Sequence, residues 1–261
     1  DKRLLLIIDE LERLFECIER REARSGDVSL PESGQSELSR TTVAILRDVL
    51  QKMERISFVL AGVTPVLRRF TTHKGERLFK LAVEVECKTL SPEACIQLIC
   101  EPVRSHYEVL QLAYQHIIRE TGRQPYLIQL VCSEVFRYAM KHQLEHITRS
   151  HVEQVLDELV PQRRHFSYLN DDVKDPEHYR IVRAVAMVQR GNTAVPFLDI
   201  AAMLERLGHK MPVEKLFDTL KHLELNAPQV LERRVGTRDT FRLTVGLYAR
   251  HLRTLLREER W

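Results

Sequence analysis

The sequence predicts an α/β fold, in which an incomplete parallel sheet is followed by a helical region and by a small module of helices and a β-hairpin. Three observations indicate this. Residues 1–90 alternate apolar runs with a helical stripe, residues 91–170 carry helix-start signals only, and residues 171–261 contain two short runs around a glycine turn. We expect these ranges to be three domains, since 261 residues exceed the roughly 100–200 of a usual single core.

The first range is expected to form a mostly parallel sheet. Its predicted strands are Leu4–Ile8, Ile56–Ala61 and Ala82–Cys87, and an apolar stripe over Arg40–Glu54 predicts a helix between the first two strands. Alternating strands and helices are typical of parallel sheets. The five residues of the first strand are all apolar, which predicts a strand that is buried on both faces.

Start signals predict four helices in the second range. Pro92, preceded by a serine, suits the first turn of a helix, and Pro125 and Thr148 open two more. A further helix is expected over about Leu110–Glu120, and it should end at Gly122. Together these helices predict a small bundle.

The third range changes pattern again. The predicted helices are Tyr179–Arg190, Phe197–Leu207, Val213–Leu223 and Leu247–Glu259, and a predicted hairpin joins Gln229–Val235 to Thr240–Val245. Three helices followed by a hairpin are typical of a winged-helix module.

Two carboxylates, Asp9 and Glu10, follow the first strand directly. Open α/β sheets bind their ligands at the carboxyl ends of the strands. In nucleoside triphosphatases the first carboxylate of such a pair holds magnesium, usually through water, and the second orients or deprotonates the attacking water. The alternative interpretation is a core strand that ends in a solvated acidic pair.

A phosphate-binding loop of the form GxxxxGK[ST] should precede such a strand, because backbone amides and a lysine must hold the phosphates. The sequence contains no such loop, and it opens at Asp1 without an initiator methionine. We therefore expect the first half of the nucleotide site to lie outside this chain, on the same polypeptide or on another.

Composition excludes several classes of protein. The net charge of +3 is too small to indicate a nucleic-acid-binding protein by itself. The sequence has no membrane-spanning apolar run and no signal-peptide pattern. Its five cysteines show no CxxC spacing, which favours reduced thiols over a disulfide framework or a zinc site. We expect a cytoplasmic protein without membrane partners.

Five segments in order resemble the AAA+-related STAND ATPases of prokaryotes. They are Leu4–Leu14, Phe58–Gly62, Leu90–Ala94, Thr121–Gln129 and Phe241–Leu252. The resemblance implies an AAA+-like P-loop NTPase core that lacks its Walker A region over residues 1–90, a helical lid over 91–170 and a winged-helix domain over 171–261. It also implies ATP and Mg²⁺ as cofactors and ATP hydrolysis once the phosphate loop is supplied, with the chain alone inactive.

The resemblance assigns roles to residues of the core. Asp9 matches the metal-associated residue and Glu10 the catalytic residue of the Walker B pair. Thr64 stands where the family places its γ-phosphate sensor, although it also suits a Thr-Pro turn. Arg68 and Arg69 stand where the family often carries an arginine that reaches a neighbouring subunit's phosphate, although paired arginines are also common on a solvated helix.

The segment from Gly122 to Tyr126 matches the lid motif that packs against the base. A proline at a helix start, Pro125, gives an apolar surface without a spare amide and suits the wall of an adenine site. Gly122 and Pro125 also suit a simple helix end and helix start, and both interpretations can hold together. The family usually has a second glycine where this chain has Arg123.

Two functions remain open. The first is a nucleotide-dependent signalling or assembly switch that acts as a homo-oligomer or on a protein effector. The second is a DNA-directed AAA+ ATPase, of the replication-initiator or transposition-regulator type, that binds duplex DNA through the winged helix. The charges of the third helix nearly cancel, whereas the hairpin and last helix are basic, with eight arginines against four acidic residues. This balance favours the signalling function.

Overall fold

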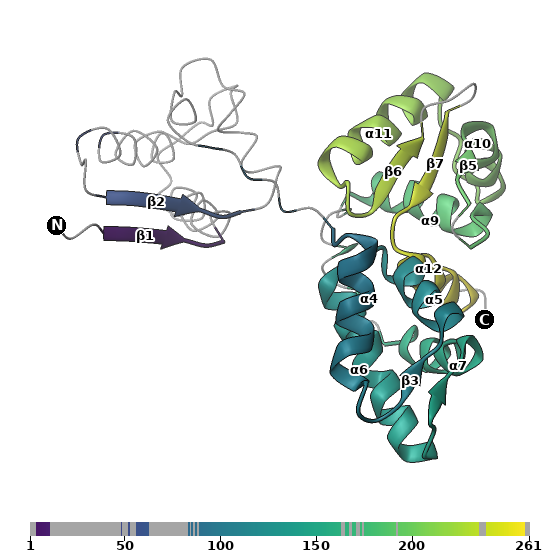
Figure 1. Cartoon of the computed structure of the whole chain (residues 1–261). Helices are drawn as coiled ribbons and strands as arrows, with labels where there is room; N and C mark the ends of the chain where they lie inside the picture. The colour runs from purple at the N-terminus through teal and green to yellow at the C-terminus, as the bar shows by residue number, and fades with distance from the viewer. Residues whose placement is uncertain are drawn as a thin grey trace. The chain divides into compact units, whose positions relative to one another are not determined.

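A computed structural model describes residues 4–10, 48, 52, 56–62, the odd-numbered residues from 83 to 89, and 90–258 without 163–164, 167–168, 171–172, 174, 192 and 235–238. The chain divides into two units, Asp1–Glu86 and Cys87–Trp261 (Figure 1). No helix within the described ranges has both the length and the apolarity that crossing a membrane requires.

The first unit contains two parallel strands. β1 (Leu4–Ile8) and β2 (Ile56–Leu60) pair in register over their whole length. The N–H of Ala61 donates to the carbonyl oxygen of Ile8 at 2.9 Å and continues the ladder past the end of β2. The first two predicted strands and their parallel direction are confirmed. Because the strands run in the same direction, the residues that follow them lie at the same edge of the sheet.

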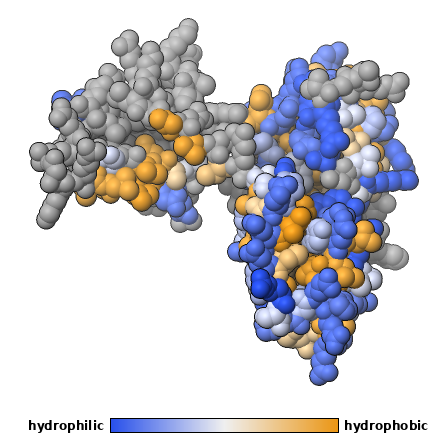
Figure 2. All heavy atoms as spheres, in the orientation of Figure 1, coloured by the Kyte–Doolittle hydropathy of each residue, from blue (hydrophilic) through white to orange (hydrophobic). Residues whose placement is uncertain are grey.

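The prediction that the first strand is buried on both faces is wrong. The side chains of Leu4 to Ile7 are between 41% and 64% exposed. Val59 on β2 is also exposed, and Figure 2 shows apolar surface in this unit. Among the described strands β1 has one hydrogen-bonded neighbour, β2, so the pair keeps open edges and uncovered apolar faces.

The third strand predicted for this range is wrong at the residues described there. Val83 and Val85 belong to no strand and are almost fully exposed. No described strand lies beside them, so their backbone has no ladder to join. Of the helix predicted over Arg40–Glu54, Asp48 and Lys52 are helical and form an ion pair at 2.6 Å. The rest of that helix lies outside the described residues.

Four helices and one short parallel pair form the helical region. These elements are α4 (Pro92–Cys100), the 3-10 turn η2 (Glu101–Val103), β3 (Glu108–Val109), α5 (Gln111–Thr121), α6 (Pro125–His142), β4 (His146–Ile147) and α7 (Arg149–Leu159). All four predicted helices are confirmed. The expectation of helices alone is wrong, because β3 pairs with β4 and joins the segment before α5 to the segment before α7. Two-residue strands are too short to leave a pattern in the sequence.

Side-chain caps explain where two of these helices begin. The hydroxyl oxygen of Ser91 accepts from the N–H of Ala94 at 3.1 Å, ahead of the proline in the first turn of α4. At α7 the hydroxyl of Thr148 accepts from the N–H of His151, and the His151 ring nitrogen Nδ1 accepts from the N–H of Thr148. Histidine thus takes the place of the usual glutamate in a capping box.

A second group of elements, which we call the C-terminal module, follows the helical region. It comprises α9 (Pro176–Val188), β5 (Val195–Pro196), α10 (Phe197–Arg206), α11 (Val213–Asn226), β6 (Leu231–Arg234) and β7 (Thr240–Leu243). The three strands form an antiparallel sheet in the order β5-β7-β6 (Figure 1). The predicted helices and hairpin strands are confirmed, whereas the two-residue β5 was not predicted.

The last helix, α12 (Gly246–Glu258), packs against both regions. It contacts α9 of the C-terminal module and α5 of the helical region. Its buried apolar residues are Leu247, Tyr248, Ala249 and Leu252. They join the apolar residues of both regions in one core.

A buried ionic network fastens α12 to α5 and α7. The Arg250 guanidinium donates from Nη1 and Nη2 to the two carboxylate oxygens of Glu153, at 2.7 and 3.2 Å, and from Nε to Glu120 Oε2 at 3.0 Å. The Nε2 atom of His116 lies 2.8 Å from Glu153 Oε1. His116 and Glu120 are almost fully buried, and a buried charge is stable only when it is paired.

Burial and pairing set the protonation states in this network. Burial lowers the pKa of His116, and the nearby carboxylates of Glu120 and Glu153 only partly oppose this shift. Burial by itself raises the pKa of Glu153, but hydrogen bonds and positive charge from Arg250 outweigh it, so the pKa is lowered overall. At neutral pH the network therefore contains a neutral His116 and an ionised Glu153.

The stability of the second unit should fall as the pH drops below about 6.5, the ordinary pKa of His116. In that range the unfolded chain binds a proton that the folded chain, with its lower pKa, does not bind. This group contributes a slope of at most about 1.4 kcal/mol per pH unit. His116→Gln should flatten the pH dependence of the free energy of unfolding, measured by urea unfolding with helical circular dichroism. An equally steep dependence in the variant would contradict this assignment.

Loss of the Arg250 side-chain charge should destabilise the second unit. Arg250→Met removes the three hydrogen bonds that the guanidinium donates to Glu120 and Glu153, and the ion pairs that remain, with Arg119 at 3.5 Å and Arg149 at 3.8 Å, are longer. Because Arg250 and Glu153 are only partly buried, we expect a loss of about 2 kcal/mol. Arg137→Met is the matched control, because Arg137 forms an ion pair with Glu134 on the surface. The control should change the free energy of urea unfolding by less than about 1 kcal/mol. Equal losses in the two variants would show that the network is not stabilising.

Candidate functional site

The acidic pair lies at the carboxyl end of β1. Both side chains, Asp9 and Glu10, are exposed. The N–H of Glu10 donates to Asp9 Oδ1 at 2.8 Å, and Glu10 has a φ of +52°. A positive φ at a residue other than glycine costs on the order of 1–2 kcal/mol and is enriched at functional sites. The turn ends the strand at the pair and leaves both carboxylates at the ligand-binding edge of a parallel sheet.

The chemistry of the pair fits magnesium. Proteins hold Mg²⁺ mostly through one or two carboxylates, with the remaining positions filled by water and substrate phosphates. The described residues contain no group of three or more histidine, cysteine, aspartate or glutamate side chains that could enclose a metal ion. Asp9 and Glu10 together supply the one or two carboxylates that such a site uses.

β2, the strand that pairs with β1, precedes the remaining predicted core residues in the sequence. Ala61 and Gly62 follow β2 at the same edge of the sheet as the acidic pair, and both are partly buried. Thr64, Arg68 and Arg69 lie outside the described residues, so their roles stay predictions.

The predicted lid residues lie together on one turn between α5 and α6. Gly122 ends α5 with a φ of +59°, and Arg123 follows with a φ of +63°. The carbonyl oxygen of Arg123 accepts from the N–H of Leu90 at 3.2 Å, which ties the start of the second unit to this turn. Pro125 then occupies the first turn of α6. The sequence signals for the end of one helix and the start of the next are both confirmed.

Arg123, one of the two residues with a positive φ on this turn, departs from the pattern of the resembling family. The resembling family usually has glycine where this chain has Arg123, and a glycine adopts a φ of +63° without strain. The arginine is exposed, and no hydrogen bond or ion pair of its side chain is found within the described residues. The turn therefore keeps its left-handed backbone with an exposed arginine in place of the family's glycine.

Tyr126 offers an aromatic surface next to this turn. Its side chain is 53% exposed, and its hydroxyl lies 3.5 Å from the His165 ring nitrogen Nδ1. An exposed ring beside a proline at a helix start fits the wall of a base-binding site. The turn and the acidic pair belong to different units. The structure places Asp9 and Glu10 side by side in the first unit, and the predicted lid residues side by side in the second.

The turn is packed tightly against the C-terminal module. A Cβ atom added to Gly122 would lie 2.5 Å from the carbonyl oxygen of Thr244, just after β7. The side-chain amide of Gln124 donates to the carbonyl oxygen of Gln229, just before β6. No spacing in the sequence indicated either contact, because each joins residues more than a hundred positions apart.

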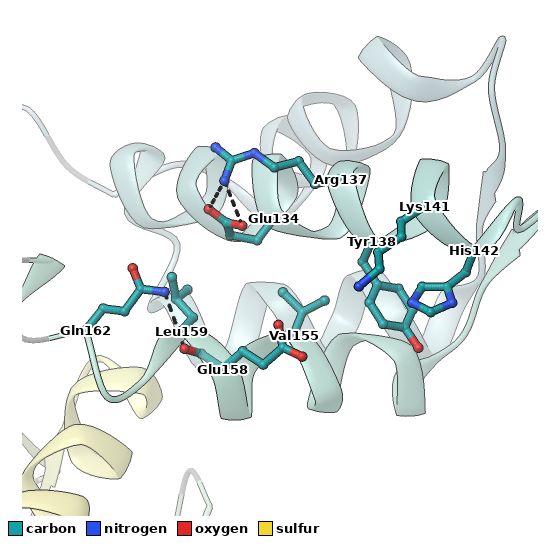
Figure 3. Close-up of a pocket in the computed structure, with 9 residues that line it drawn as sticks. All are labelled: Glu134, Arg137, Tyr138, Lys141, His142, Val155, Glu158, Leu159 and Gln162. Carbon is teal, nitrogen blue, oxygen red and sulfur yellow. Dashed lines mark hydrogen bonds and ion pairs between the residues drawn. The ribbon is translucent and has the colours of Figure 1, made fainter.

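A hollow of about 170 Å³ lies elsewhere, between α6 and α7 (Figure 3). Its lining includes the ion pair of Glu134 with Arg137, and also Lys141 and Glu158. The charges nearly cancel, and the volume is smaller than the roughly 300–1,000 Å³ of most small-molecule sites. None of the predicted site residues lines it.

The basic surface that the sequence indicated on the hairpin and α12 is largely used within the chain. Five of its arginines make internal ion pairs or hydrogen bonds: Arg233, Arg234, Arg242, Arg250 and Arg253. On the hairpin their partners are Asp239, at 2.7 Å from the Arg233 guanidinium, and Glu232. Arg238 and Arg260 lie outside the described residues. Internal pairing reduces the positive charge that this surface offers to phosphates.

No family model and no curated protein sequence matches the chain. Solved structures do match it. The ORC2 protein of Aeropyrum pernix, in its ADPNP-ADP complexes, has a TM-score of 0.50 and 12% identity, covering 98% of this chain and 66% of that chain. The Holliday junction branch migration motor RuvB of Thermotoga maritima has a TM-score of 0.44 and 11% identity, with coverages of 91% and 75%. Cdc6p of Pyrobaculum aerophilum has a TM-score of 0.33 and 14% identity, with coverages of 99% and 81%.

The likeness to ORC2 extends over nearly the whole chain, and at 12% identity it shows the fold alone. The chain has a helix-rich α/β fold like that of the ORC2 structure. The expected α/β class is confirmed at this level.

The close packing of the turn predicts that Gly122 tolerates no side chain. Gly122→Ala adds a methyl group against a backbone carbonyl, which cannot move away cheaply. Gly191→Ala is the matched control, because Gly191 has a φ of +57° and open space around it. The control should cost only the left-handed penalty of about 1–2 kcal/mol, and Gly122→Ala clearly more, in urea unfolding. Equal costs would show that the turn and Thr244 are not in contact.

Proposed function

We propose that this chain is part of a STAND-type AAA+ ATPase that works as a nucleotide-dependent signalling or assembly switch. In this proposal residues 1–90 are the Walker B half of the nucleotide-binding core, 91–170 form the lid, and 171–261 form a winged helix. The observation that carries it is the exposed pair Asp9 and Glu10 at the carboxyl end of a strand that runs parallel to its neighbour.

Each site residue has one role in this proposal. Asp9 holds the Mg²⁺ ion of Mg-ATP, usually through water, and Glu10 orients the attacking water. The ion neutralises phosphate charge when bound. Thr64 senses the γ-phosphate, and Arg68 or Arg69 reaches the phosphate of a neighbouring subunit. Gly122, Pro125 and Tyr126 form the wall against the adenine.

A phosphate-binding segment completes the site, on the same polypeptide or on a second chain. Two observations support this. The sequence has no GxxxxGK[ST] loop, and within the part of the chain that the structure describes β1 and β2 form a two-stranded sheet with exposed apolar side chains. A further parallel strand would satisfy the open edge and cover apolar surface. The proposal includes a homo-oligomer or a protein effector as partner, because an arginine finger acts across a subunit boundary. It also includes a cytoplasmic location, which cysteines without CxxC spacing favour.

Glu10→Gln should abolish ATP turnover and leave nucleotide affinity nearly unchanged, because the amide keeps the shape of the side chain but cannot act as a base. The assay uses the protein that carries the phosphate-binding segment. Glu145→Gln, at another exposed carboxylate, is the control and should keep full turnover. Turnover of Glu10→Gln at the wild-type rate would remove Glu10 from the catalytic role.

A DNA-directed ATPase is the second candidate, and the module of three helices and a hairpin favours it. The charges of α11, the helix that would enter the major groove, argue against DNA binding. Lys215 pairs with Glu177 at 2.6 Å, and the Lys221 ammonium lies 4.3 Å from the centre of the Phe217 ring. Acidic residues on the same helix would repel phosphates.

In a mobility-shift assay with short duplex DNA, we therefore expect no retained complex even at low salt. Low salt strengthens phosphate contacts, so any affinity for DNA would be highest under this condition. A salt-dependent shift that disappears after Lys221→Glu would establish the second candidate instead.

A further inference from the structure

The segment that connects the helical region to the C-terminal module is part of the core. Phe166, Leu169 and Val173 lie between the last residue of α7 and the first of α9, and all three are buried. The Phe166 ring stacks on the His251 ring of α12, with 4.6 Å between ring centres. A hinge needs a segment with few crossing contacts, whereas the described residues of this segment pack into the core.

On the side of the helical region, α12 is fastened by polar contacts as well as by apolar packing. Arg250 reaches Glu120 on α5 and Glu153 on α7 through three hydrogen bonds. The His251 ring nitrogen Nδ1 bonds the carbonyl oxygen of Val160, at the end of α7, at 2.9 Å. One turn of α12 thus binds two separate helices of the helical region.

The same helix is fastened to the C-terminal module. Arg253 Nη1 donates to the carbonyl oxygen of Gln189, the residue after α9, at 3.0 Å. The side chain of Gln189 in turn accepts from the N–H of Leu243 on β7 at 2.7 Å. Successive turns of α12 therefore hold the helical region and the C-terminal module.

Two glycines allow close packing between the helical region and the C-terminal part of the chain. Gly122 lies against Thr244, and a Cβ atom added to Gly246 would lie 2.7 Å from Glu120 Oε2. A side chain at Gly122 would push α5 away from the segment before α12, and a side chain at Gly246 would displace the Glu120 carboxylate. The two regions meet at a distance that permits little relative rotation.

We propose that α12 joins the helical region and the C-terminal module into one rigid body, with Arg250 as its main polar fastening. A displacement of the turn at Gly122 then moves α11 and the hairpin directly, without a hinge between them. Division of the chain by contacts supports this, because the one boundary falls between Glu86 and Cys87, ahead of the whole body. The proposal does not require that the chain binds nucleotide.

Distance measurement by double electron–electron resonance tests the proposal. Spin labels attach to p-acetylphenylalanine at Leu112 on α5 and Leu225 on α11, two exposed positions, so the native cysteines remain. The full chain of 261 residues should give one narrow distance distribution. A broad distribution or two separate distances in the wild-type chain would overturn the proposal without any further variant.

Two variants then test the fastening. Arg250→Met should broaden the distribution, because α12 loses its bonds to α5 and α7, whereas Arg137→Met should keep it narrow. Circular dichroism checks that both variants stay helical. A folded Arg250→Met that keeps the narrow distribution would show that Arg250 does not fasten the body. If Arg250→Met does not fold, the wild-type distribution still tests the proposal, and Arg250→Lys then tests the fastening. Arg250→Lys keeps the charge but loses the paired hydrogen bonds, so it should broaden the distribution.

Discussion

The close approach of α5 and α12 is the constraint on which the second unit depends. Two glycines, Gly122 and Gly246, let a backbone carbonyl and a buried carboxylate come within a distance that no side chain would allow. At that distance Arg250 can reach two acidic residues from different helices. The carboxylate of Glu120, which lies against Gly246, accepts one of these hydrogen bonds, so the close packing and the ionic network share a residue.

This junction also positions the candidate site. The turn just before Tyr126 packs against the segment after β7, so the proposed adenine wall rests on the C-terminal module. A site on such a turn is better defined than a site on a free loop. Any nucleotide that contacts the turn therefore acts on a surface that is continuous with α11 and the hairpin. In the first unit, the acidic pair depends on a narrower support, one parallel pair of strands.

Local signals predicted most of the second unit. Proline, glycine and capping residues such as Ser91 and Thr148 act within one turn, so the sequence places the helix boundaries to within a few residues. The burial of the first strand was predicted wrongly, because burial depends on neighbours that the strand's own sequence does not contain. The contact of Gly122 with Thr244 and the pairing of Arg250 join distant parts of the chain, and no periodicity encodes them. For the same reason, the pairing of the hairpin arginines could not be predicted from their number.

The proposed nucleotide site depends on the turn before α6 and on the aromatic ring of Tyr126 beside it, which should contact the base. Photolabelling with 8-azido-ATP and Mg²⁺ tests this most directly, in the protein that carries its phosphate-binding segment. We expect the labelled peptide to contain Pro125 and Tyr126, and unlabelled ATP to prevent the labelling. Labelling confined to peptides outside the turn, equally prevented by ATP, would contradict it.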